Sequence, residues 1–179
     1  MVENIYLVQE LIRGYKRKRI SPRCLLKIDL KKAYDSISWS FLRDKMVNLN
    51  FPDQMIVWVM ECVTTTSFSI SLNGRLNGFF KGRKGLRQGD PLSPLLFVIC
   101  LEYLSRLLKS LEDKFRFKFH PKCEELKITH LVFADDLMFS KGDAISVKFL
   151  MDCLNEFSQC SRLTANNLKS NLYQSGMKP

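Results

Sequence analysis

The sequence predicts an α+β fold in which helices pack on one face of an antiparallel sheet. Short apolar runs bounded by turn residues, such as residues 24–29 and 128–133, are typical of strands. Longer segments, above all residues 95–111 and 144–160, repeat apolar residues at the spacing of one helix face. A helix with one apolar stripe buries that stripe against a sheet, which gives a layered arrangement.

The first part of the chain should form a helix, a strand and two further helices. Their expected bounds are 5–16, 24–29, 40–49 and 53–63. Pro52 marks the start of the last of these helices, because proline fits the beginning of a helix.

A β-hairpin is expected next, from residues 67–73 and 77–81 around Gly74. The alternation of apolar residues in its first strand predicts one buried face, formed by Phe68, Ile70 and Leu72.

Two long helices complete the layer. In residues 95–111 the apolar positions are 97, 101, 104, 108 and 111, so this helix should lie across the sheet. Residues 144–160 should pack beside it. Their apolar stripe consists of Val147, Leu150, Leu154 and Phe157.

An adjacent pair of acids, Asp135 and Asp136, stands inside an apolar run. Neighbouring carboxylates in such a place lose hydration and repel each other, so the pair suggests a bound cation. The flanks 128–133 and 137–140 are typical of strands, which would place both acids at the tip of a tight hairpin. An ordinary Asp-rich turn is the alternative.

A further acid, Asp29, ends the strand-like run that begins at Cys24. A rigid sheet positions such a residue while leaving it open to a cleft, so Asp29 could join the acid pair in holding hard divalent ions through oxygen. Asp35 is expected to be a structural acid at a helix start. Tyr34 is a candidate core aromatic as well as a candidate site residue.

A basic, glycine-rich loop over residues 81–91 precedes the long helix. Glycines allow close approach of the backbone to a ligand, and its Arg and Lys side chains suit phosphates. Ser93 and Pro94 form a good helix start, with Ser93 as the N-cap. A solvated basic loop is the alternative.

Together these segments resemble the palm of a reverse transcriptase, most closely that of the non-LTR (LINE-type) retrotransposons common in plants. Four stretches carry the resemblance, in the family's order: residues 29–35, 85–94, 133–136 and 163–170. The resemblance implies a palm with an antiparallel sheet. It also implies that residues 1–179 are a partial domain with a remnant of the fingers, most of the fingers and the thumb being absent.

The resemblance implies roles for particular residues. The metal-binding acids would be Asp29, Asp135 and Asp136, holding two Mg²⁺ ions, with Mn²⁺ as a substitute. The residues that contact nucleotide and template would be Tyr34, at the sugar pocket, and Arg87, Gln88 and Gly89. Lys169 falls where the family has a lysine proposed to protonate pyrophosphate, although a solvated loop charge is the alternative.

The implied reaction is phosphoryl transfer to a primer 3′ hydroxyl, assisted by two metal ions. RNA template, DNA primer and deoxynucleoside triphosphates would be the partners, and a net charge of +10 with a pI near 9.4 suits such polyanions. The longest apolar stretch, residues 95–101, is far short of the roughly 20 residues that span a bilayer. No membrane partner is therefore expected, and the oligomeric state is left open.

The cysteine pattern points to an intracellular protein, in the nucleus or the cytoplasm. The six cysteines show no Cys-x-x-Cys pair and no partnering histidine spacing, which argues against a zinc site. Several, such as Cys62 and Cys100, lie in apolar stretches where a reduced cysteine packs as a small hydrophobe, which argues against a disulfide framework. Two other readings compete with an active polymerase: a truncated, inactive transposon remnant, and a nucleic-acid-binding fragment. The intact acids argue against both. Exposed apolar surface is expected where fingers and thumb would dock.

Overall fold

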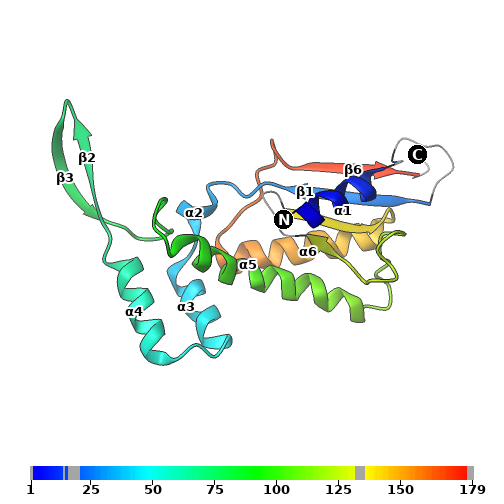
Figure 1. The fold of residues 1–179 in the computed structure, drawn as a ribbon, viewed down its shortest axis with the longest axis horizontal. Helices are drawn as coiled ribbons and strands as arrows, with labels where there is room; N and C mark the ends of the chain where they lie inside the picture. The colour runs from blue at the N-terminus through cyan, green and yellow to red at the C-terminus, as the bar shows by residue number, and fades with distance from the viewer. Residues whose placement is uncertain (1, 14, 16–20, 132–135, 177–179) are drawn as a thin grey trace. The chain divides into compact units, whose positions relative to one another are not determined.

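The structure is a computed structural model, and it describes residues 2–13, 15, 21–131 and 136–176 (Figure 1). The chain forms two compact units, each assembled from segments that are distant in the sequence. The sheet unit contains residues 1–30, 104–157 and 164–179. The loop unit contains residues 31–103 and 158–163.

A four-stranded antiparallel sheet forms the centre of the sheet unit, with the strand order β4-β5-β1-β6. The strands are β1 (Arg23–Ile28), β4 (His130–Leu131), β5 (Asp136–Lys141) and β6 (Asn171–Ser175). The predicted antiparallel sheet is confirmed. The edge strand β6 was not predicted, because its residues are largely exposed and lack the apolar alternation of a half-buried strand.

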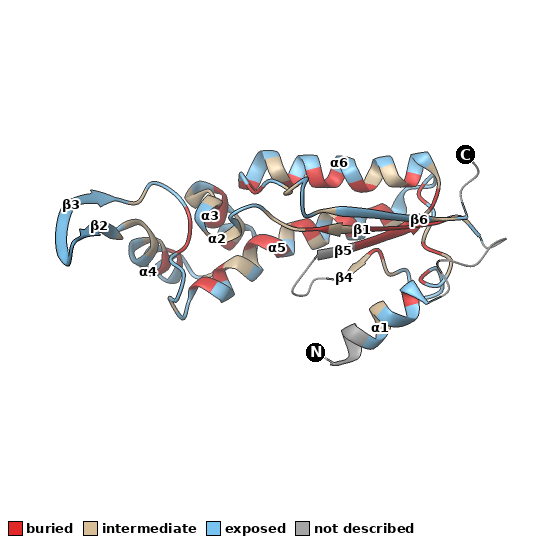
Figure 2. Cartoon of the chain, turned by 90° about the horizontal axis from the view of Figure 1, so that it is seen from above, coloured by how far each residue is buried: buried red, intermediate tan, exposed pale blue. Residues whose placement is uncertain are grey.

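Helices cover the sheet in this unit. They are α1 (Val2–Ile12), α5 (Ser93–Lys109) and α6 (Ala144–Ser161), and a 3₁₀ turn, η1 (Ser110–Asp113), follows α5. The parts of α5 and α6 in the sheet unit lie side by side along one face (Figures 1 and 2). The Cys153 Sγ of α6 donates to the Leu107 carbonyl of α5 at 3.6 Å. The predicted stripes are confirmed, since Leu104, Leu108, Leu150 and Leu154 are buried.

The core runs through β1, whose consecutive residues Cys24, Leu25 and Leu26 are all buried (Figure 2). Side chains alternate between the faces of a strand, so β1 is covered on both faces. Leu25 packs in one cluster with Leu11 of α1 and Phe139 of β5. A strand buried in this way holds the residue that follows it, Asp29, in a fixed place.

The loop unit contains the two helices and the hairpin that were predicted, together with a short helix, α2 (Ala33–Ser36), that was not predicted. The predicted elements are α3 (Trp39–Asn48), α4 (Asp53–Thr64), β2 (Ser67–Leu72) and β3 (Arg75–Lys81). Ser38 caps α3 by accepting a hydrogen bond from the Phe41 amide at 3.5 Å. Pro52 is the N-cap of α4, as its position in the sequence indicated.

The predicted buried face of the hairpin is wrong. Phe68, Ile70 and Leu72 are 41%, 60% and 63% exposed, although β2 and β3 pair over the predicted residues. A two-stranded sheet buries a face only when another layer packs on it. The described residues supply no such layer over this hairpin.

Two predicted boundaries also differ. Asp136 is the first residue of β5 and pairs with Ile28, so it belongs to a strand and not to a two-residue turn. Asp135 lies outside the described residues. The first helix ends at Ile12, before the predicted limit at residue 16, which itself lies outside the described residues.

The six cysteines are unpaired, and four of them are buried. Burial raises the pKa of the Cys24, Cys123 and Cys153 thiols to about 11 and that of Cys100 to about 12. These thiols therefore remain protonated at neutral pH and pack as small hydrophobes. Among the described residues, no helix combines the length and the apolar character that a membrane crossing requires.

Candidate functional site

Asp29 follows directly after β1 and is half-buried. The pairing of β1 with β5 places Ile28 opposite Asp136. The sheet register therefore brings the end of β1 and the start of β5 together, so that Asp29 and the backbone of Asp136 lie at the same end of the sheet. Asp135 and the side chain of Asp136 lie outside what the structure describes.

A turn formed by residues 165–170 holds Asp29. The Asn166 backbone amide donates to the Asp29 carbonyl at 2.7 Å, and the Asn166 Nδ2 donates to the Asp29 Oδ2 at 3.3 Å. On the other side, the Asp29 amide donates to the Ser170 Oγ at 3.2 Å. A bridge between Leu30 and Ala165 continues the pairing. Backbone and carboxylate are both restrained, as a metal ligand requires.

Lys169 belongs to the same turn, and its side chain is exposed. Its backbone amide donates to the Asn166 carbonyl at 3.0 Å. The structure thus places Lys169 within a few residues of the groups that hold Asp29. Its expected role in protonating pyrophosphate stays a prediction.

In the loop unit, the basic glycine-rich loop is joined to the segment that follows Asp29 in sequence. The Gly85 amide donates to the Ile37 carbonyl at 2.8 Å, and the Leu86 amide donates to the Tyr34 carbonyl at 2.7 Å. The Trp39 Nε1 donates to the Gly85 carbonyl at 2.7 Å. The structure therefore brings the first and second palm-like stretches together through backbone hydrogen bonds.

Gly85 makes this junction possible. Its φ is +87°, and a Cβ on it would lie 2.8 Å from the carbonyl carbon and oxygen of Asp35. Only glycine has both the backbone conformation and the missing side chain that this contact needs.

Beyond the junction, Arg87, Gln88 and Gly89 are all exposed. The Gln88 Nε2 donates to the Asp35 Oδ1 at 3.3 Å. Asp35 lies in the first turn of the short helix α2, and not at the start of the predicted helix, α3, whose N-cap is Ser38. Its contact with Gln88 was not indicated by the sequence. Gly89 also has a φ of +87°, with open space around it. The three candidate contact residues are thus accessible to a ligand.

Tyr34 is half-buried and stacks on Phe97, with ring centroids 5.0 Å apart and an interplanar angle of 25°. The stack fixes the orientation of the ring. Because a fixed, half-buried ring suits both predicted roles of Tyr34, as a core aromatic and as a residue that lines a sugar pocket, both roles stay predictions.

At the loop, the Ser93 hydroxyl donates to the Arg87 carbonyl at 2.7 Å. The helix α5 begins at Ser93, so the residue predicted to be the N-cap is the first residue of the helix. The Ser93 hydroxyl thus ties the last turn of the loop to the helix.

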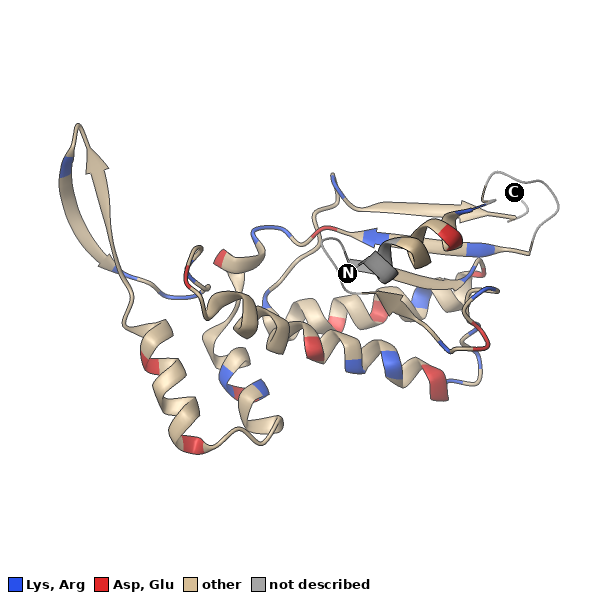
Figure 3. Ribbon diagram, in the orientation of Figure 1, with Lys and Arg blue, Asp and Glu red and all other residues tan. Residues whose placement is uncertain are grey.

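The loop unit carries a group of exposed cations close to these residues in sequence (Figure 3). They are Lys31, Lys32, Lys81, Arg83, Lys84 and Arg87. Such a group attracts the phosphates of a polyanion.

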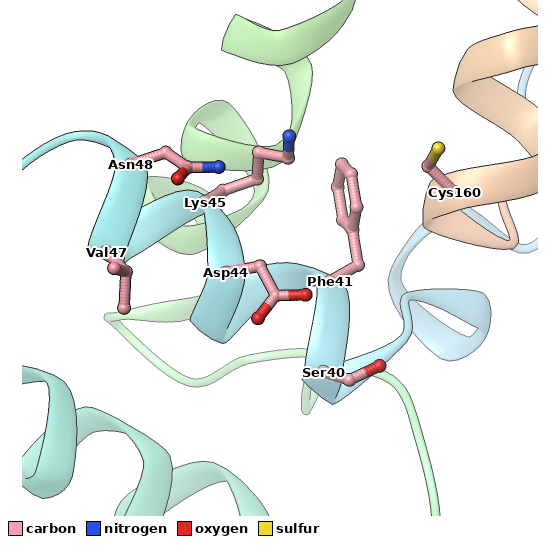
Figure 4. Close-up of a pocket in the computed structure, with 7 residues that line it drawn as sticks. All are labelled: Ser40, Phe41, Asp44, Lys45, Val47, Asn48 and Cys160. Carbon is pink, nitrogen blue, oxygen red and sulfur yellow. The ribbon is translucent and has the colours of Figure 1, made fainter.

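A pocket in the loop unit is separate from these candidate residues (Figure 4). It lies along α3 beside the last turn of α6, and Ser40, Phe41, Asp44, Lys45, Val47, Asn48 and Cys160 line it. The Lys45 Nζ lies 3.5 Å from the centroid of the Tyr103 ring, which makes it part of a packed cation–π pair. None of the predicted site residues lines this pocket.

The family of this chain follows from its sequence as a whole. The family described as reverse transcriptase (RNA-dependent DNA polymerase) matches residues 3–178. The chain belongs to this family. As a reverse transcriptase by family, it is 31% identical over 144 residues to a Retrovirus-related Pol polyprotein from the type-1 retrotransposable element R2 of Popillia japonica. That alignment covers 80% of the chain and 23% of the polyprotein.

Two further relatives of this reverse transcriptase domain differ greatly in length. The chain is 22% identical over 169 residues to a transposon TX1 149 kDa protein of Xenopus laevis. This alignment covers 94% of the chain and 12% of that protein. The chain is 32% identical over 109 residues to an uncharacterized mitochondrial protein of Arabidopsis thaliana. This alignment covers 60% of the chain and 89% of that protein. The chain thus spans less than a quarter of the retrotransposon proteins and most of the mitochondrial one.

Solved structures confirm the fold of this reverse transcriptase domain. A telomerase from Candida albicans, in complex with a fragment of telomeric RNA, superposes with a TM-score of 0.68 at 13% identity, over 99% of the chain and 30% of that protein. An apo telomerase from Candida tropicalis superposes with a TM-score of 0.66 at 15% identity, over 98% of the chain and 35% of that protein. The α+β palm fold predicted from the sequence is confirmed.

The sequence did not single out Asn166 and Ser170 as site residues. It indicated only that residues 163–170 resemble a palm motif, and Lys169 was the residue given a role. Their contacts with Asp29 join positions more than 130 residues apart, and no local pattern reveals such a contact.

Proposed function

We propose that this chain is the palm of an RNA-directed DNA polymerase from a plant non-LTR retrotransposon. The observation that carries the proposal is the β1–β5 register, which brings the residue before Asp29 opposite Asp136. A strand-end carboxylate beside an acid pair suits a site for hard cations. Retrotransposon proteins are among the relatives of the chain, which supports a retrotransposon source, and the relative from Arabidopsis thaliana favours a plant.

The acids would hold divalent metal ions, with Mg²⁺ as the natural cation and Mn²⁺ as a substitute. Their fit rests on chemistry, because carboxylate oxygens are the ligands that such hard ions prefer. Asp29 supplies a restrained carboxylate, and Asp135 and Asp136 would supply the others. Bound metal ions lower the charge cost of moving a phosphoryl group onto a primer 3′ hydroxyl.

The remaining residues would bind and orient the substrates. Tyr34 would line the sugar pocket of the incoming deoxynucleoside triphosphate, while Gln88 and Gly89 contact the nucleotide and the RNA template. Arg87 and the neighbouring cations would bind phosphates. Lys169 would hold the proton that the leaving pyrophosphate takes. The enzyme would act inside the cell, in the nucleus or the cytoplasm.

Primer extension on an RNA template tests the proposal. The wild-type chain should extend a DNA primer in Mg²⁺, and Asp135→Asn should lower the extension rate by on the order of 100-fold, because the site loses a charged ligand. Affinity for the primer–template should stay within about twofold or rise, because removing an acid removes a repulsion with phosphate.

Asp152→Asn makes the same chemical change on an exposed residue of α6 and should leave extension unchanged. Cooperative unfolding of each variant shows that it is folded. A folded wild-type chain that binds nucleic acid without extending a primer would contradict the proposal and favour a binding fragment or an inactive remnant.

A further inference from the structure

The orientation of the Asn166 amide is fixed by two opposed hydrogen bonds. Its Oδ1 accepts a hydrogen bond from the Leu168 backbone amide at 3.2 Å. Its Nδ2 donates to the Asp29 Oδ2 at 3.3 Å. An amide side chain has one accepting and one donating end, so the bond to Leu168 directs the donating end at Asp29.

The turn that carries Asn166 is closed on itself and anchored to β1. The amides of Lys169 and Ser170 both donate to the Asn166 carbonyl, at 3.0 and 2.8 Å. The Asn166 amide bonds the Asp29 carbonyl at 2.7 Å, so the turn and the strand end share a backbone contact. The side chain of Asn166 therefore reaches Asp29 from a rigid base.

We propose that Asn166 is a positioning residue for Asp29, an inference that rests on the proposed function. Its amide holds one carboxylate oxygen, Oδ2, and in the described part of the chain no donor bonds the other oxygen, Oδ1. The bond fixes the rotation of the carboxylate and presents Oδ1 to a cation. The amide suits this role because it donates a hydrogen bond without bringing a positive charge that would compete with the metal.

A purely structural role for Asn166 makes a different prediction. Asn and Asp both form turns in which the side-chain oxygen accepts a backbone amide two residues on. Asp at position 166 would therefore preserve the bond to Leu168 and the turn. It would have no hydrogen to donate to Asp29 and would face it with a second negative charge.

The test compares Asn166→Asp with Asn167→Asp, which adds the same charge at the adjacent, exposed residue. Asn166→Asp should still unfold cooperatively because the turn is kept, at a urea concentration somewhat below that of Asn167→Asp because the bond to Asp29 is lost. It should lower primer extension at least about tenfold and raise the Mg²⁺ concentration for half-maximal extension, whereas Asn167→Asp should do neither. Asn166→Ala removes the donor without adding charge and should also lower extension.

Two outcomes in this assay would overturn the inference. Equal extension by Asn166→Asp and Asn167→Asp would show that Asn166 only forms the turn. Full extension by Asn166→Ala, with loss in Asn166→Asp, would show that the added charge and not the missing donor caused the effect.

A double-mutant cycle tests the contact without any catalysis. The change in the unfolding constant of the double variant Asp29→Ala/Asn166→Ala should differ by at least about threefold from the product of the changes in the two single variants. In a cycle of Asp29→Ala with Asn167→Ala, the double variant should equal that product. An inactive wild-type chain would contradict the proposed function alone. A cycle without coupling would overturn the positioning role whether or not the chain extends a primer.

Discussion

The two units of the chain hold their candidate site residues in different ways. In the sheet unit, Asp29 is restrained at its amide, its carbonyl and its carboxylate by Asn166 and Ser170. In the loop unit, backbone bonds to the segment 34–37 anchor Gly85 and Leu86, and the side chains of the next residues, Arg87 and Gln88, are exposed. A metal ligand must hold one geometry, whereas side chains that meet changing nucleotides need a fixed base and accessible tips. The difference matches those two tasks.

Breaking the contact that anchors the glycine-rich loop at Gly85 should have the largest effect on the free energy of unfolding. In Gly85→Ala the new Cβ would meet the Asp35 backbone at 2.8 Å, in a backbone conformation that L residues rarely adopt. Strain and overpacking together should lower the free energy of unfolding by about 4 kcal/mol. Urea unfolding measures this loss.

Gly89→Ala is the matched control for that variant. Gly89 has the same φ of +87° and no atom within 4 Å of its Cβ position, so only the backbone cost of about 1 kcal/mol applies. If the two variants were equally stable, the close approach of Gly85 to Asp35 would not be what anchors the loop.

The sequence predicted most elements of both units because their signals are local. The long helices α5 and α6 have apolar stripes that any window of the sequence shows, and Pro52 and Ser93 mark helix starts at their own positions. The acids and the glycine-rich loop were found in the same way, since each motif is a short run of neighbouring residues.

The remaining features depend on distant partners. The edge strand β6 pairs with β1 across more than 140 residues, and the bonds of Asn166 and Ser170 to Asp29 follow from that pairing. The exposed hairpin face was predicted to be buried because alternation reports the amphipathic character of a strand and not the presence of a covering layer. Packing of this kind is decided by the whole fold.

A pH experiment should separate the units, because both histidines, His120 and His130, lie in the sheet unit. His120 is fully buried, and burial, followed by the charges of Arg23 and Lys122, lowers its pKa to about 4. Its Nδ1 accepts the Lys122 amide at 3.2 Å, which leaves Nε2 to bond the Tyr15 hydroxyl at 3.2 Å. Protonation would destroy the first of these bonds.

The sign of the effect follows from the lowered pKa. The unfolded chain, whose His120 has a pKa near 6.5, binds the proton more tightly than the folded chain. The stabilisation is complete above about pH 6.5 and should be lost as the pH falls toward 4, by up to about 3 kcal/mol. Urea unfolding at several pH values measures it, and His120→Gln should flatten the dependence. Persistence of the full slope in that variant would contradict the assignment to His120.

The smallest effect is expected at the hairpin, where the loop unit is least packed. Phe79 is 77% exposed, so Phe79→Ser should change the free energy of unfolding by no more than about 0.5 kcal/mol. It should also reduce self-association, because it removes apolar surface.

Phe68→Ser is the comparison for this variant. Phe68 is 41% exposed and stacks on Phe80, with ring centroids 5.8 Å apart, so its replacement should lower the free energy of unfolding by about 1 kcal/mol. Light scattering and urea unfolding measure both properties. Phe79 pairs with Ser69, so it lies on the face of the hairpin opposite to Phe68. A large loss of stability in Phe79→Ser would mean that this opposite face is covered in solution, and the two units would then differ less in packing than their exposures indicate.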